Sequence, residues 1–462
     1  MALTIVVGLG RSGIGASRLL QYQKKPVVLI EKGNTAAHQS SAEALRNQGI
    51  QVELNRPLDL ASFAPWRTML ETVVIGPGIP WDHPTLEQLR SEGVQVRGEM
   101  DLAWSALKHI PWIGITGTNG KTTVTHLLSH LLQAAGLRAP MGGNMGVSAA
   151  EMALEISSGL QPTPDWLVME LSSYQIEAAP NISPRIGLWT TLTPDHLERH
   201  GNIEAYRAIK RRLLERSEFA IFNADDPDLR RQRSSWGRGL WVSAEGPLPN
   251  DQAADVWIDA EDHVCDASGS LFAADALAMP GAHNRQNLLL VTAAARKIGL
   301  QSEQIAAGLK SFPGVPHRLE RLGSLASGTT VYNDSKATNY DAAEVGLRAM
   351  ERPVVVLAGG QTKRGEAEGW LAQLKTRSCC VVLFGAGANE LKELVNGSDY
   401  VGELQLCDGL EGAVAIAVSA AERLKASSLI LSPACASFDQ YRDFEARGDH
   451  FRQLIKPLLP SV

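Results

Sequence analysis

Short apolar runs rich in β-branched residues alternate along the chain with longer stretches in which apolar residues recur at helical spacing. Near the N-terminus the runs TIVV (4–7), VVLIE (27–31) and TVVIG (72–76) have the strand pattern, and ASRLLQYQ (16–23) has the helical one. A glycine-containing turn joins the first strand to this helix. The order strand, helix, strand predicts a βαβ unit and, up to about residue 107, a small α/β domain.

The same alternation continues through the middle of the chain. The strand WIGIT (112–116) is followed by a predicted helix, TVTHLLSHLLQAAG (123–136), which Gly136 is placed to end. Residues 240–280 have a more irregular pattern, and the helix RQNLLLVTAAARKIG (285–299) closes this region. Further strands are predicted at WLVMEL (166–171), GLWTTL (187–192), FAIFN (219–223) and the short DVWIDA (255–260).

A third α/β segment begins near SFPGVPHRLE (311–320). Its strands are predicted at TVYND (330–334), VVVLAGG (354–360), CVVLFGAG (380–387) and SLILSPA (428–434), with helical stretches between them. Alternating strands and helices predict parallel sheets. We therefore predict an α/β protein of three domains: a Rossmann-like N-terminal domain (1–107), a central domain of the P-loop ATPase type (108–314) and a Rossmann-like C-terminal domain (315–462).

Composition supports this division and excludes some functions. The chain has 462 residues, of which 44% are hydrophobic and 20% charged, the balance of a globular protein with several cores. A net charge of −6 argues against nucleic-acid binding, because phosphate backbones require a basic excess. The five cysteines form no C-x-x-C pair, and we find no signal peptide and no apolar run of about 20 residues. We expect a cytoplasmic protein without membrane insertion.

The first glycine-rich turn has the spacing of a nucleotide site. Gly8, Gly10 and Gly13 follow the first strand as G-x-G-x-x-G, and Glu31 ends the next strand. Such glycines let backbone amides and a helix N-terminus approach a diphosphate. From the residues alone, three readings stay open: a nicotinamide dinucleotide, another nucleotide diphosphate such as a UDP-sugar, or tight packing of strand against helix.

The second turn, TGTNGKTT (116–123), nearly matches the phosphate-binding P-loop. The general pattern is G-x-x-x-x-G-K-[ST], and Ile115 occupies the position of its first glycine. Backbone amides at Gly117, Asn119 and Gly120 are free to bind phosphates in this prediction. Lys121 reaches the outer phosphates, and the Thr122 hydroxyl is suited to hold Mg²⁺. The turn predicts ATP binding.

Three further side chains are candidates for metal chemistry. Glu170 ends an apolar strand, where a buried carboxylate requires a metal or a basic partner. His196 either ligates a metal or caps a helix. Lys210 lies among Arg207, Arg211 and Arg212, which is either a solvated basic face or an environment that lowers the lysine pKa. A neutral amine adds CO₂ to form a carbamate, and an anionic carbamate binds Mg²⁺.

These motifs, in this order, resemble the Mur ligase family. The resemblance rests on TGTNGKTT together with NDSKATN (333–339) and SPACASFDQYRDFEARG (432–448), and it extends over essentially the whole chain. It implies an enzyme in which ATP phosphorylates a substrate carboxylate and an amine attacks the acyl phosphate, giving an amide, ADP and phosphate. The two C-terminal motifs look like those of the branch that adds D-glutamate to UDP-N-acetylmuramoyl-L-alanine, and this likeness implies a step of peptidoglycan precursor synthesis.

The resemblance also implies roles for individual residues. Lys121, His196 and a carbamylated Lys210 would be catalytic, and Thr122, Glu170, His196 and Lys210 would hold Mg²⁺. Residues expected to bind ATP are Gly117, Thr118, Asn119, Gly120, Lys121, Thr122, Thr123, Asn284, Asn287, Arg318, Asp334 and Lys336. The UDP substrate would contact Gly10, Arg11, Ser12 and Asn144, and D-glutamate would contact Thr338, Lys363, Ser437 and Phe444. We expect small-molecule partners only and a monomer.

The chain departs from the family pattern at three places. Glu31 is followed by Lys32 and Gly33 where an aspartate and a Thr-Arg-type pair are usual, so the uracil contacts are not predicted. Thr191 replaces a common asparagine, and GGQTKRG (359–365) replaces G-G-x-D-K while keeping the lysine. Three rival functions remain to be tested: a related Mur ligase or folylpolyglutamate synthase, a nicotinamide-dependent oxidoreductase, and a regulatory nucleotide-binding module without turnover.

Overall fold

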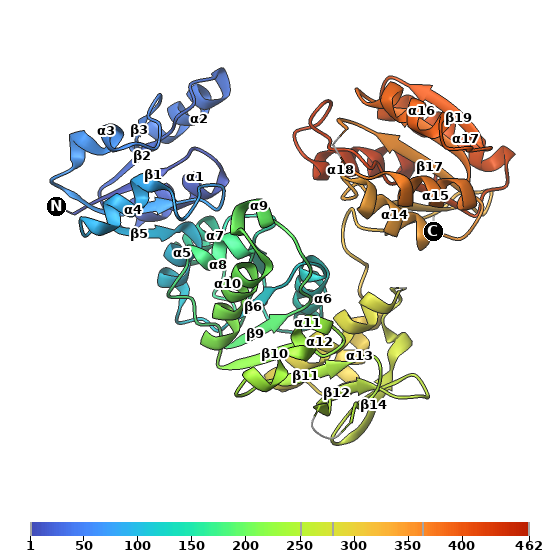
Figure 1. The fold of residues 1–462 in the computed structure, drawn as a ribbon, viewed down its shortest axis with the longest axis horizontal. Coiled ribbons are helices and arrows are strands. Elements are labelled where there is room, and N and C mark those ends of the chain that lie inside the picture. Colours follow the sequence, from blue (N-terminus) through green and yellow to red (C-terminus); the bar gives the residue numbers. More distant parts are fainter. Residues whose placement is uncertain (1, 250–251, 280, 363–364, 461–462) are drawn as a thin grey trace. The chain divides into compact units, whose positions relative to one another are not determined.

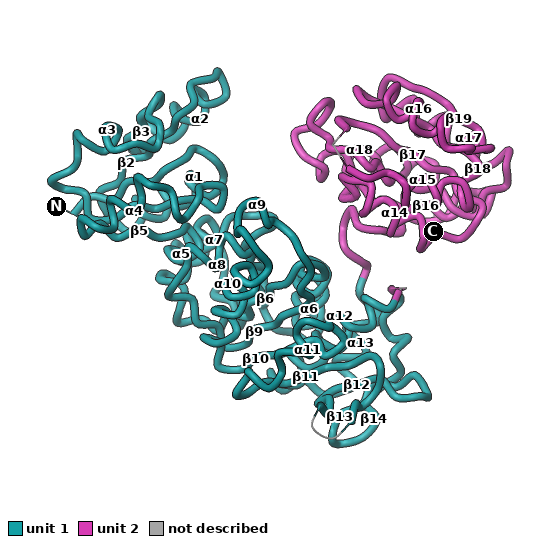
Figure 2. Tube along the Cα trace, in the orientation of Figure 1, with its two compact units in different colours: residues 1–278, 282–312 teal, residues 279–281, 313–462 magenta. Residues whose placement is uncertain are grey.

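The chain folds around three β-sheets covered by helices. The computed structural model describes residues 2–249, 252–279, 281–362 and 365–460. Its contacts divide it into two compact units, one formed by residues 1–278 and 282–312 and the other by residues 279–281 and 313–462 (Figure 2). The first unit holds two sheets and the second unit holds one. The predicted α/β class is therefore confirmed, while the boundaries of the three domains stay a prediction.

The first sheet is entirely parallel. Its strand order is β3-β2-β1-β4-β5, and the predicted strands are β1 (Leu3–Val7), β2 (Val27–Ile30) and β4 (Leu70–Ile75). In the register, Val7 pairs with Ile30 on one side and with Ile75 on the other. All five residues of β1 are buried, which explains its continuous apolar run. The other elements are β3 (Gln51–Glu53), β5 (Gln95–Gly98), α1 (Arg11–Tyr22), α2 (Ala36–Arg46), α3 (Leu60–Phe63) and α4 (Pro84–Ser91).

The second sheet is the large sheet of the first unit, with the order β14-β13-β12-β11-β10-β9-β6-β8-β7 (Figure 1). Its parallel centre places β6 (Trp112–Thr116) between β8 (Leu167–Glu170) and β9 (Ile186–Trp189). The carboxyl ends of these three strands therefore meet at one edge. The outer strands on each side are β7 (Met141–Gly143), β10 (Phe219–Asn223), β11 (Leu240–Ser243), β12 (Val256–Ile258), β13 (His263–Asp266) and β14 (Gly269–Ala273).

Helices of the central region cover this sheet. The predicted helix after β6 is α6 (Lys121–Ala134), and Gly136 beyond it has a φ of +88°. The predicted closing helix is α12 (Ala282–Ile298), but a further helix, α13 (Ser302–Lys310), follows it. The remaining helices are α5 (Glu99–Leu107), α7 (Ala149–Ser157), α8 (Ser173–Glu177), α9 (Leu197–His200), α10 (Ile203–Arg216) and α11 (Pro227–Arg231).

The region 240–280 is more regular than its pattern indicates. Strands β11 to β14 extend the central sheet, and β12 pairs antiparallel with β13, as β13 does with β14. These strands have only three to five residues each. Runs this short seldom show a clear alternation, and β14 at the sheet edge keeps its residues exposed or half-buried. Only β12 was predicted, as DVWIDA, and the other three strands were hidden by their length rather than by their composition.

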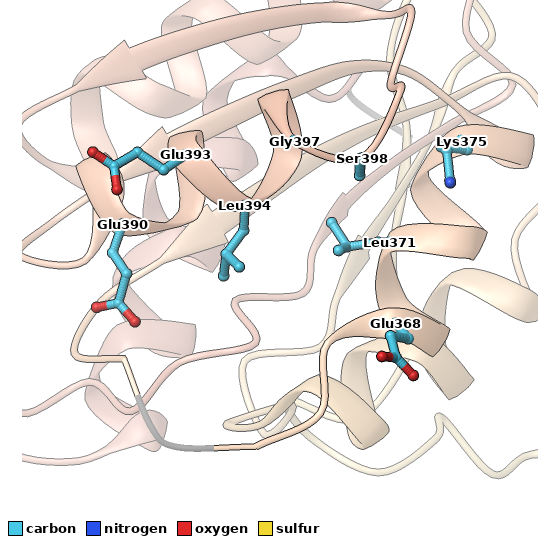
Figure 3. Close-up of a pocket in the computed structure, with 8 residues that line it drawn as sticks. All are labelled: Glu368, Leu371, Lys375, Glu390, Glu393, Leu394, Gly397 and Ser398. Carbon is cyan, nitrogen blue, oxygen red and sulfur yellow. The ribbon is translucent and has the colours of Figure 1, made fainter.

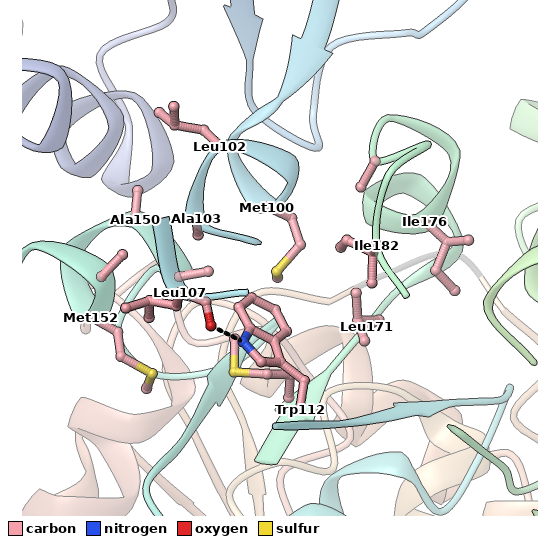
Figure 4. Close-up of a cluster of buried hydrophobic side chains, with 14 of the residues drawn as sticks. Met100, Leu102, Ala103, Leu107, Trp112, Ala150, Met152, Leu171, Ile176 and Ile182 are labelled. Carbon is pink, nitrogen blue, oxygen red and sulfur yellow. Dashed lines mark hydrogen bonds between the residues drawn. The ribbon is translucent and has the colours of Figure 1, made fainter. Parts of the chain in front are cut away.

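One hydrophobic core joins the two sheets of the first unit. Side chains of α5 and α7 lie together with residues of the central sheet in a single buried cluster (Figure 4). In this cluster the Trp112 indole donates a hydrogen bond to the Leu107 carbonyl over 3.2 Å. Polar contacts reinforce the seam, since Arg18 pairs with Glu151 and the Tyr22 hydroxyl bonds the Ser157 carbonyl at 2.7 Å. Burial of this apolar surface holds the two sheets as one body.

The second unit contains a six-stranded sheet of order β15-β16-β20-β17-β18-β19. The four predicted strands are β16 (Thr330–Asn333), β17 (Val354–Gly359), β18 (Ser378–Phe384) and β20 (Ser428–Leu431), and they pair in parallel. Two edge strands were not predicted, β15 (Glu320–Ser324) and β19 (Glu403–Cys407), because neither has a buried apolar run. The helices are α14 (Tyr340–Arg348), α15 (Glu368–Arg377), α16 (Ala388–Asn396), α17 (Leu410–Arg423) and α18 (Phe444–Ile455).

Among the residues that the structure describes, no helix is long and apolar enough to cross a membrane.

A buried carboxylate at the seam makes the stability of the first unit depend on pH. Glu99 is 3% exposed and accepts a hydrogen bond from the Ala150 amide, and its burial raises its pKa to about 7. Because the pKa is higher in the folded chain than in the unfolded chain, this group contributes stability at acidic pH that is lost as the pH rises through 7. The cost of ionising it is on the order of 3 kcal/mol.

We expect Glu99→Gln to unfold at the same temperature as the parent near pH 5 and at a higher temperature at pH 8. The amide oxygen of glutamine still accepts from Ala150, but it carries no charge to desolvate. Thermal unfolding of both proteins from pH 5 to pH 8 measures this difference. Parallel pH profiles for the two proteins would contradict a titrating Glu99.

Candidate functional site

The loop after β6 has the backbone shape of a phosphate-binding turn. Gly117 and Gly120 have φ angles of +148° and +84°, values that favour glycine. A Cβ at Gly117 would lie 1.9 Å from the Thr190 hydroxyl, so the neighbouring segment packs directly on the loop. Gly120 precedes α6 without a side-chain cap, and the first helical turn therefore presents Lys121, Thr122 and Thr123 at the loop.

The segment after β9 forms hydrogen bonds with this loop. The Thr118 amide donates to the Thr191 carbonyl at 2.8 Å, and the Asn119 amide donates to the Thr191 hydroxyl at 3.0 Å. The Thr118 hydroxyl in turn contacts the backbone of Thr193. The prediction of a free Asn119 amide is therefore wrong for this conformation. Thr191, which departs from the family pattern, supplies the oxygen that accepts from the Asn119 amide.

Two lysines meet at one carbonyl of the loop. The Lys121 ammonium donates to the Gly117 carbonyl at 3.0 Å and to the Thr118 carbonyl at 2.8 Å. Lys210, from α10, donates to the same Gly117 carbonyl at 2.9 Å and to the Thr116 hydroxyl at 3.3 Å. The structure thus brings together two predicted catalytic residues that are 89 positions apart in the sequence. Their shared acceptor keeps both amines at the loop.

Lys210 does not lie on a solvated basic face, because it is 1% exposed. Its pKa is lowered well below the usual value by burial first and by the charge of Lys121 second. A neighbouring cation was predicted to lower this pKa, but that cation is Lys121 rather than an arginine, and burial is the larger cause. Of the three arginines named for it, Arg207 pairs with Asp228 and Arg211 pairs with Glu215. A neutral amine is the form that adds CO₂, so the chemistry predicted for Lys210 remains available.

The Tyr206 side chain lies against both Lys210 and the loop after β6. Tyr206 is 2% exposed, its ring lies 4.6 Å from the Lys210 nitrogen, and its hydroxyl lies 3.4 Å from that of Thr118. Tyr206 was not among the predicted site residues. Its position one turn before Lys210 on α10 was the available signal, since residues four apart share a face of a helix.

Glu170 is a buried carboxylate with one unsatisfied oxygen. It is 2% exposed at the end of β8, and its Oε1 accepts a hydrogen bond from the Asn144 side chain at 2.9 Å. Its Oε2 has no hydrogen-bond partner among the residues that the structure describes. A buried carboxylate oxygen left in this way is an expected ligand for Mg²⁺, which prefers oxygen donors. Asn144 orients this carboxylate, and its contact with the substrate stays a prediction.

His196 lies at the same edge of the sheet but remains accessible. It has a φ of +53° and precedes the short helix α9, with its side chain 46% exposed. Its ring lies 5.2 Å from that of Tyr174, and its nitrogens face Asp195 and Glu198 at 3.5 and 3.8 Å. His196 occupies the N-cap position of α9, but its side chain makes no capping hydrogen bond there. Its assignment as a metal ligand stays a prediction.

The glycine loop of the first sheet is closed by its own carboxylate. Glu31 accepts from the Leu9 amide at 2.8 Å and from the Gly33 amide at 2.7 Å, so its oxygens hold the loop rather than stand free for a ribose. A Cβ at Gly13 would lie 1.9 Å from the Gly8 carbonyl, which confirms the tight packing of strand on helix. The N-terminus of α1 has no side-chain cap and is still open to a diphosphate.

Arg11 connects this glycine loop to the central sheet. Its guanidinium donates to the Gly146 carbonyl at 3.1 Å, in the loop that also holds Asn144. Residues 10–12, Asn144 and Glu170 therefore form a continuous path within the first unit. At the P-loop, a Cβ at Gly120 would lie 2.8 Å from the Asn287 side chain, which places that predicted ATP residue of α12 beside the loop. Asn287 also donates to Asn284 at 3.2 Å.

The predicted residues of the second unit gather at the carboxyl edge of its sheet. The Lys336 nitrogen lies 3.9 Å from the Phe444 ring. Asp334 accepts from the Leu319 amide and the Ser432 hydroxyl, and burial raises its pKa to about 7. Arg318, Thr338 and Ser437 lie on the neighbouring loops, and Ser437 is buried. Lys363 lies outside the described residues. Whether Arg318, Asp334 and Lys336 act on ATP stays a prediction.

A residue that was not predicted ties these loops together. Arg447 is fully buried in α18, and its guanidinium donates to the carbonyls of Ser335, Gly359 and Cys435 at 2.9 to 3.3 Å. Burial lowers its pKa to about 10, and no carboxylate among the described residues lies within ion-pair distance of it. Its charge is therefore stabilised by carbonyl dipoles. The motif that contains Arg447 was recognised, but its sequence gives no sign of the residue's burial.

One cavity of the second unit does not coincide with these residues. A cavity of about 600 Å³ between α15 and α16 is lined by Glu368, Leu371, Lys375, Glu390, Glu393, Leu394, Gly397 and Ser398 (Figure 3). It contains none of the predicted site residues, and its mixed charges select no ligand class. The candidate site is therefore defined by the loops at the sheet edges.

Comparison with known proteins identifies this combination of folds and loops. Residues 115–295 match the Mur ligase middle domain, and residues 317–435 match the Mur ligase, glutamate ligase domain. The UDP-N-acetylmuramoylalanine–D-glutamate ligase of Synechococcus sp. (strain CC9605) is 70% identical over 462 residues and covers both chains completely. Proteins of the same name from Prochlorococcus marinus (strain MIT 9313) and Thermosynechococcus vestitus are 64% and 44% identical, with coverage of at least 98% of each chain.

Solved structures agree in fold. The UDP-N-acetylmuramate-alanine ligase of Thermotoga maritima has a TM-score of 0.58 at 18% identity, covering 99% of both chains. A pseudomurein peptide ligase of Methanothermus fervidus has a TM-score of 0.55 at 17% identity, covering 99% of this chain and all of that one. The class of protein defined by these matches is an ATP-dependent ligase. The chain belongs to the Mur ligase family.

The unsatisfied oxygen of Glu170 yields a test with two readouts. Glu170→Gln removes an anionic ligand, so we expect the Mg²⁺ concentration for half-maximal activity to rise at least about tenfold. It also removes a buried charge, so unfolding without metal should require about 1–2 kcal/mol more free energy. Metal titration and urea unfolding measure the two effects.

The control for this prediction is Glu155→Gln, which changes a carboxylate of α7 that bonds Gln161 near the surface. It should alter neither quantity. An unchanged metal requirement in Glu170→Gln would remove Glu170 from the metal site.

Proposed function

We propose that this protein is an ATP-dependent ligase that joins D-glutamate to UDP-N-acetylmuramoyl-L-alanine and releases ADP and phosphate, in peptidoglycan precursor synthesis. The observation that carries the proposal is the match over the full length, at 70% identity, to a relative named for this activity. The site supports it, because a phosphate-binding loop, a buried lysine amine and a buried carboxylate meet at one sheet edge.

The first requirement is to hold ATP. The loop from Gly117 to Thr123 and the N-terminus of α6 provide backbone donors, and Lys121 provides a cation for the outer phosphates. In the described conformation Lys121 and the Asn119 amide bond to neighbouring backbone and hydroxyl oxygens. Phosphate oxygens would replace these acceptors. Asn284 and Asn287 border the loop from α12.

The second requirement is to bring two negative groups together. A substrate carboxylate must approach the γ-phosphate, and bound Mg²⁺ would offset their repulsion. Glu170 and Thr122 would hold one ion, and His196 with the Lys210 carbamate would hold another beside the substrate. The Lys210 amine would add to CO₂ and lose a proton, which converts a buried cation into an anion with two oxygen donors. Lys121 remains close enough to stabilise that anion.

The third requirement is to present the substrates in order. The path from residues 10–12 through Asn144 to Glu170 would place the UDP portion at the first sheet and the lactyl-alanine carboxylate at the phosphate loop. D-glutamate, with two carboxylates, would bind at Thr338, Ser437 and Phe444 together with Lys363. The buried charge of Arg447 would favour an anionic ligand there. The amine of D-glutamate would attack the acyl phosphate.

Further aspects of the proposal rest on the same reasoning. The partners are small molecules, and ATP and Mg²⁺ are the cofactors. We infer a cytoplasmic monomer, because activated nucleotides and ATP are cytoplasmic metabolites and the proposed site needs no second copy.

The reaction should show strict amino-acid selectivity. We expect phosphate release from ATP and Mg²⁺ with UDP-N-acetylmuramoyl-L-alanine only when D-glutamate is added, because each carboxylate of the correct enantiomer finds its donors. Assays with L-glutamate, L-lysine and meso-diaminopimelate run in parallel. Turnover with one of these would indicate another Mur ligase, ATP binding without turnover a regulatory module, and NAD binding an oxidoreductase.

Lys210 yields a more specific test. We expect Lys210→Ala to lose at least about 100-fold in kcat and to regain activity in part with formate or acetate, since a small carboxylate can replace the carbamate oxygens. Lys297→Ala is the matched control, because that lysine lies 3.7 Å over the Phe219 ring, far along the chain from the loop. Activity in Lys210→Ala that is unimpaired without added acid would exclude the carbamate.

A further inference from the structure

The loop that follows β4, residues 76–83, runs between two parts of the proposed site. At its beginning, a Cβ at Gly76 would lie 3.5 Å from the Ser12 side chain, so the loop abuts the glycine loop proposed for UDP. Near its end, Asp82 accepts a hydrogen bond from the Arg199 guanidinium at 3.1 Å. Between these points, Arg90 donates to the Trp81 carbonyl at 2.7 Å and stacks on its ring at 4.0 Å. The loop is thus braced against α4.

Arg199 belongs to the short helix that follows His196. Its amide donates to the His196 carbonyl at 3.0 Å. Its guanidinium also bonds Glu177 of α8 at 3.0 Å and lies 5.7 Å from the ring of Tyr174, which in turn contacts the His196 ring. A one-turn helix has little stability of its own, so these contacts determine where the histidine lies. Arg199 is therefore the anchor of the histidine segment.

We propose that Arg199 is a positioning residue that couples occupancy of the UDP loop to the placement of His196, through Asp82 on one side and Glu177 on the other. A ligand that orders residues 10–12 also restrains Gly76 and the loop after it. That restraint reaches Asp82 and favours one position of Arg199. The inference deepens the proposed function and rests on its assignment of residues 10–12 to the UDP portion of the substrate.

The two arms of Arg199 differ in strength. Glu177 has a side chain 15% exposed, and Arg199 itself is 18% exposed, so this pair is shielded from solvent. Asp82 is 68% exposed, and exposed ion pairs contribute little. The Glu177 arm therefore holds α9 in place at all times, while the Asp82 arm adds a small bias. The expected coupling is about two- to fivefold, the range of an exposed pair.

Hydrogen exchange with UDP as the ligand tests this route without turnover. In the parent protein, UDP should slow exchange at residues 9–14 and also at residues 196–203. In Asp82→Asn, the protection at residues 9–14 should persist and that at residues 196–203 should be lost. Glu218→Gln is the matched control, because it weakens a similar exposed pair with Arg185 at 3.8 Å, and it should behave like the parent.

Each other outcome overturns the inference in a distinguishable way. Equal protection at residues 196–203 in the parent and in Asp82→Asn would show that the Asp82–Arg199 ion pair does not transmit the coupling. Protection confined to residues 9–14 in the parent would show that no coupling exists. Absence of protection at residues 9–14 would reject the UDP site of the proposed function, and the coupling with it.

Kinetics add a second readout. Asp82→Asn and Arg199→Gln should each raise the KM for the UDP substrate, and their double variant should raise it less than the product of the two single effects. The expected deviation is two- to fivefold, and the KM for D-glutamate should not change with Asp82→Asn. Fully multiplicative effects would contradict a shared role.

Discussion

The central region depends on one backbone carbonyl, that of Gly117. Two lysine amines from different helices donate to it, and glycine is required there because Thr190 packs where a side chain would begin. Placing two amines at one acceptor in a buried site is electrostatically costly, and the cost is relieved when one of them gives up its proton. The geometry of the loop thereby adds the charge of Lys121 to burial, and both lower the pKa of Lys210. At this point the backbone shape of the loop, the burial of Lys210 and the reactivity of its amine depend on one another.

Much of the architecture could be read from the sequence because its strands are buried on both faces. Continuous apolar runs such as β1 and β17 are stable only where both faces of the strand are covered, in the interior of a sheet. These strands could therefore be predicted from the sequence. The edge strands β14, β15 and β19 lack this signal because none of their residues is buried, and β11 to β13 are too short to show it. Pairing with a neighbour stabilises them, and pairing across the chain is not visible in a local pattern.

The candidate site was predictable to the extent that its motifs are local. The loop of residues 116–123 and the strand-end Glu170 lie where the pattern placed them. The partners of each group were not predictable, because burial arises from distant segments. Lys210 was expected among arginines but is buried against Tyr206 and the loop, and Glu31 binds its own backbone rather than standing free. Arg447 could not be recognised, since the three carbonyls that it binds lie at or beyond the ends of three different strands.

Arg447 also limits how the pocket proposed for D-glutamate can change over evolutionary time. The guanidinium of Arg447 requires three main-chain carbonyls to keep their positions. An insertion or deletion in any of the three segments that carry them would therefore leave a buried cation unsatisfied. Side chains that project from those segments are free of this constraint. Divergence in amino-acid preference on this scaffold should therefore proceed by replacement of single residues on loops of fixed length, with the arginine retained as the lineage changes its substrate.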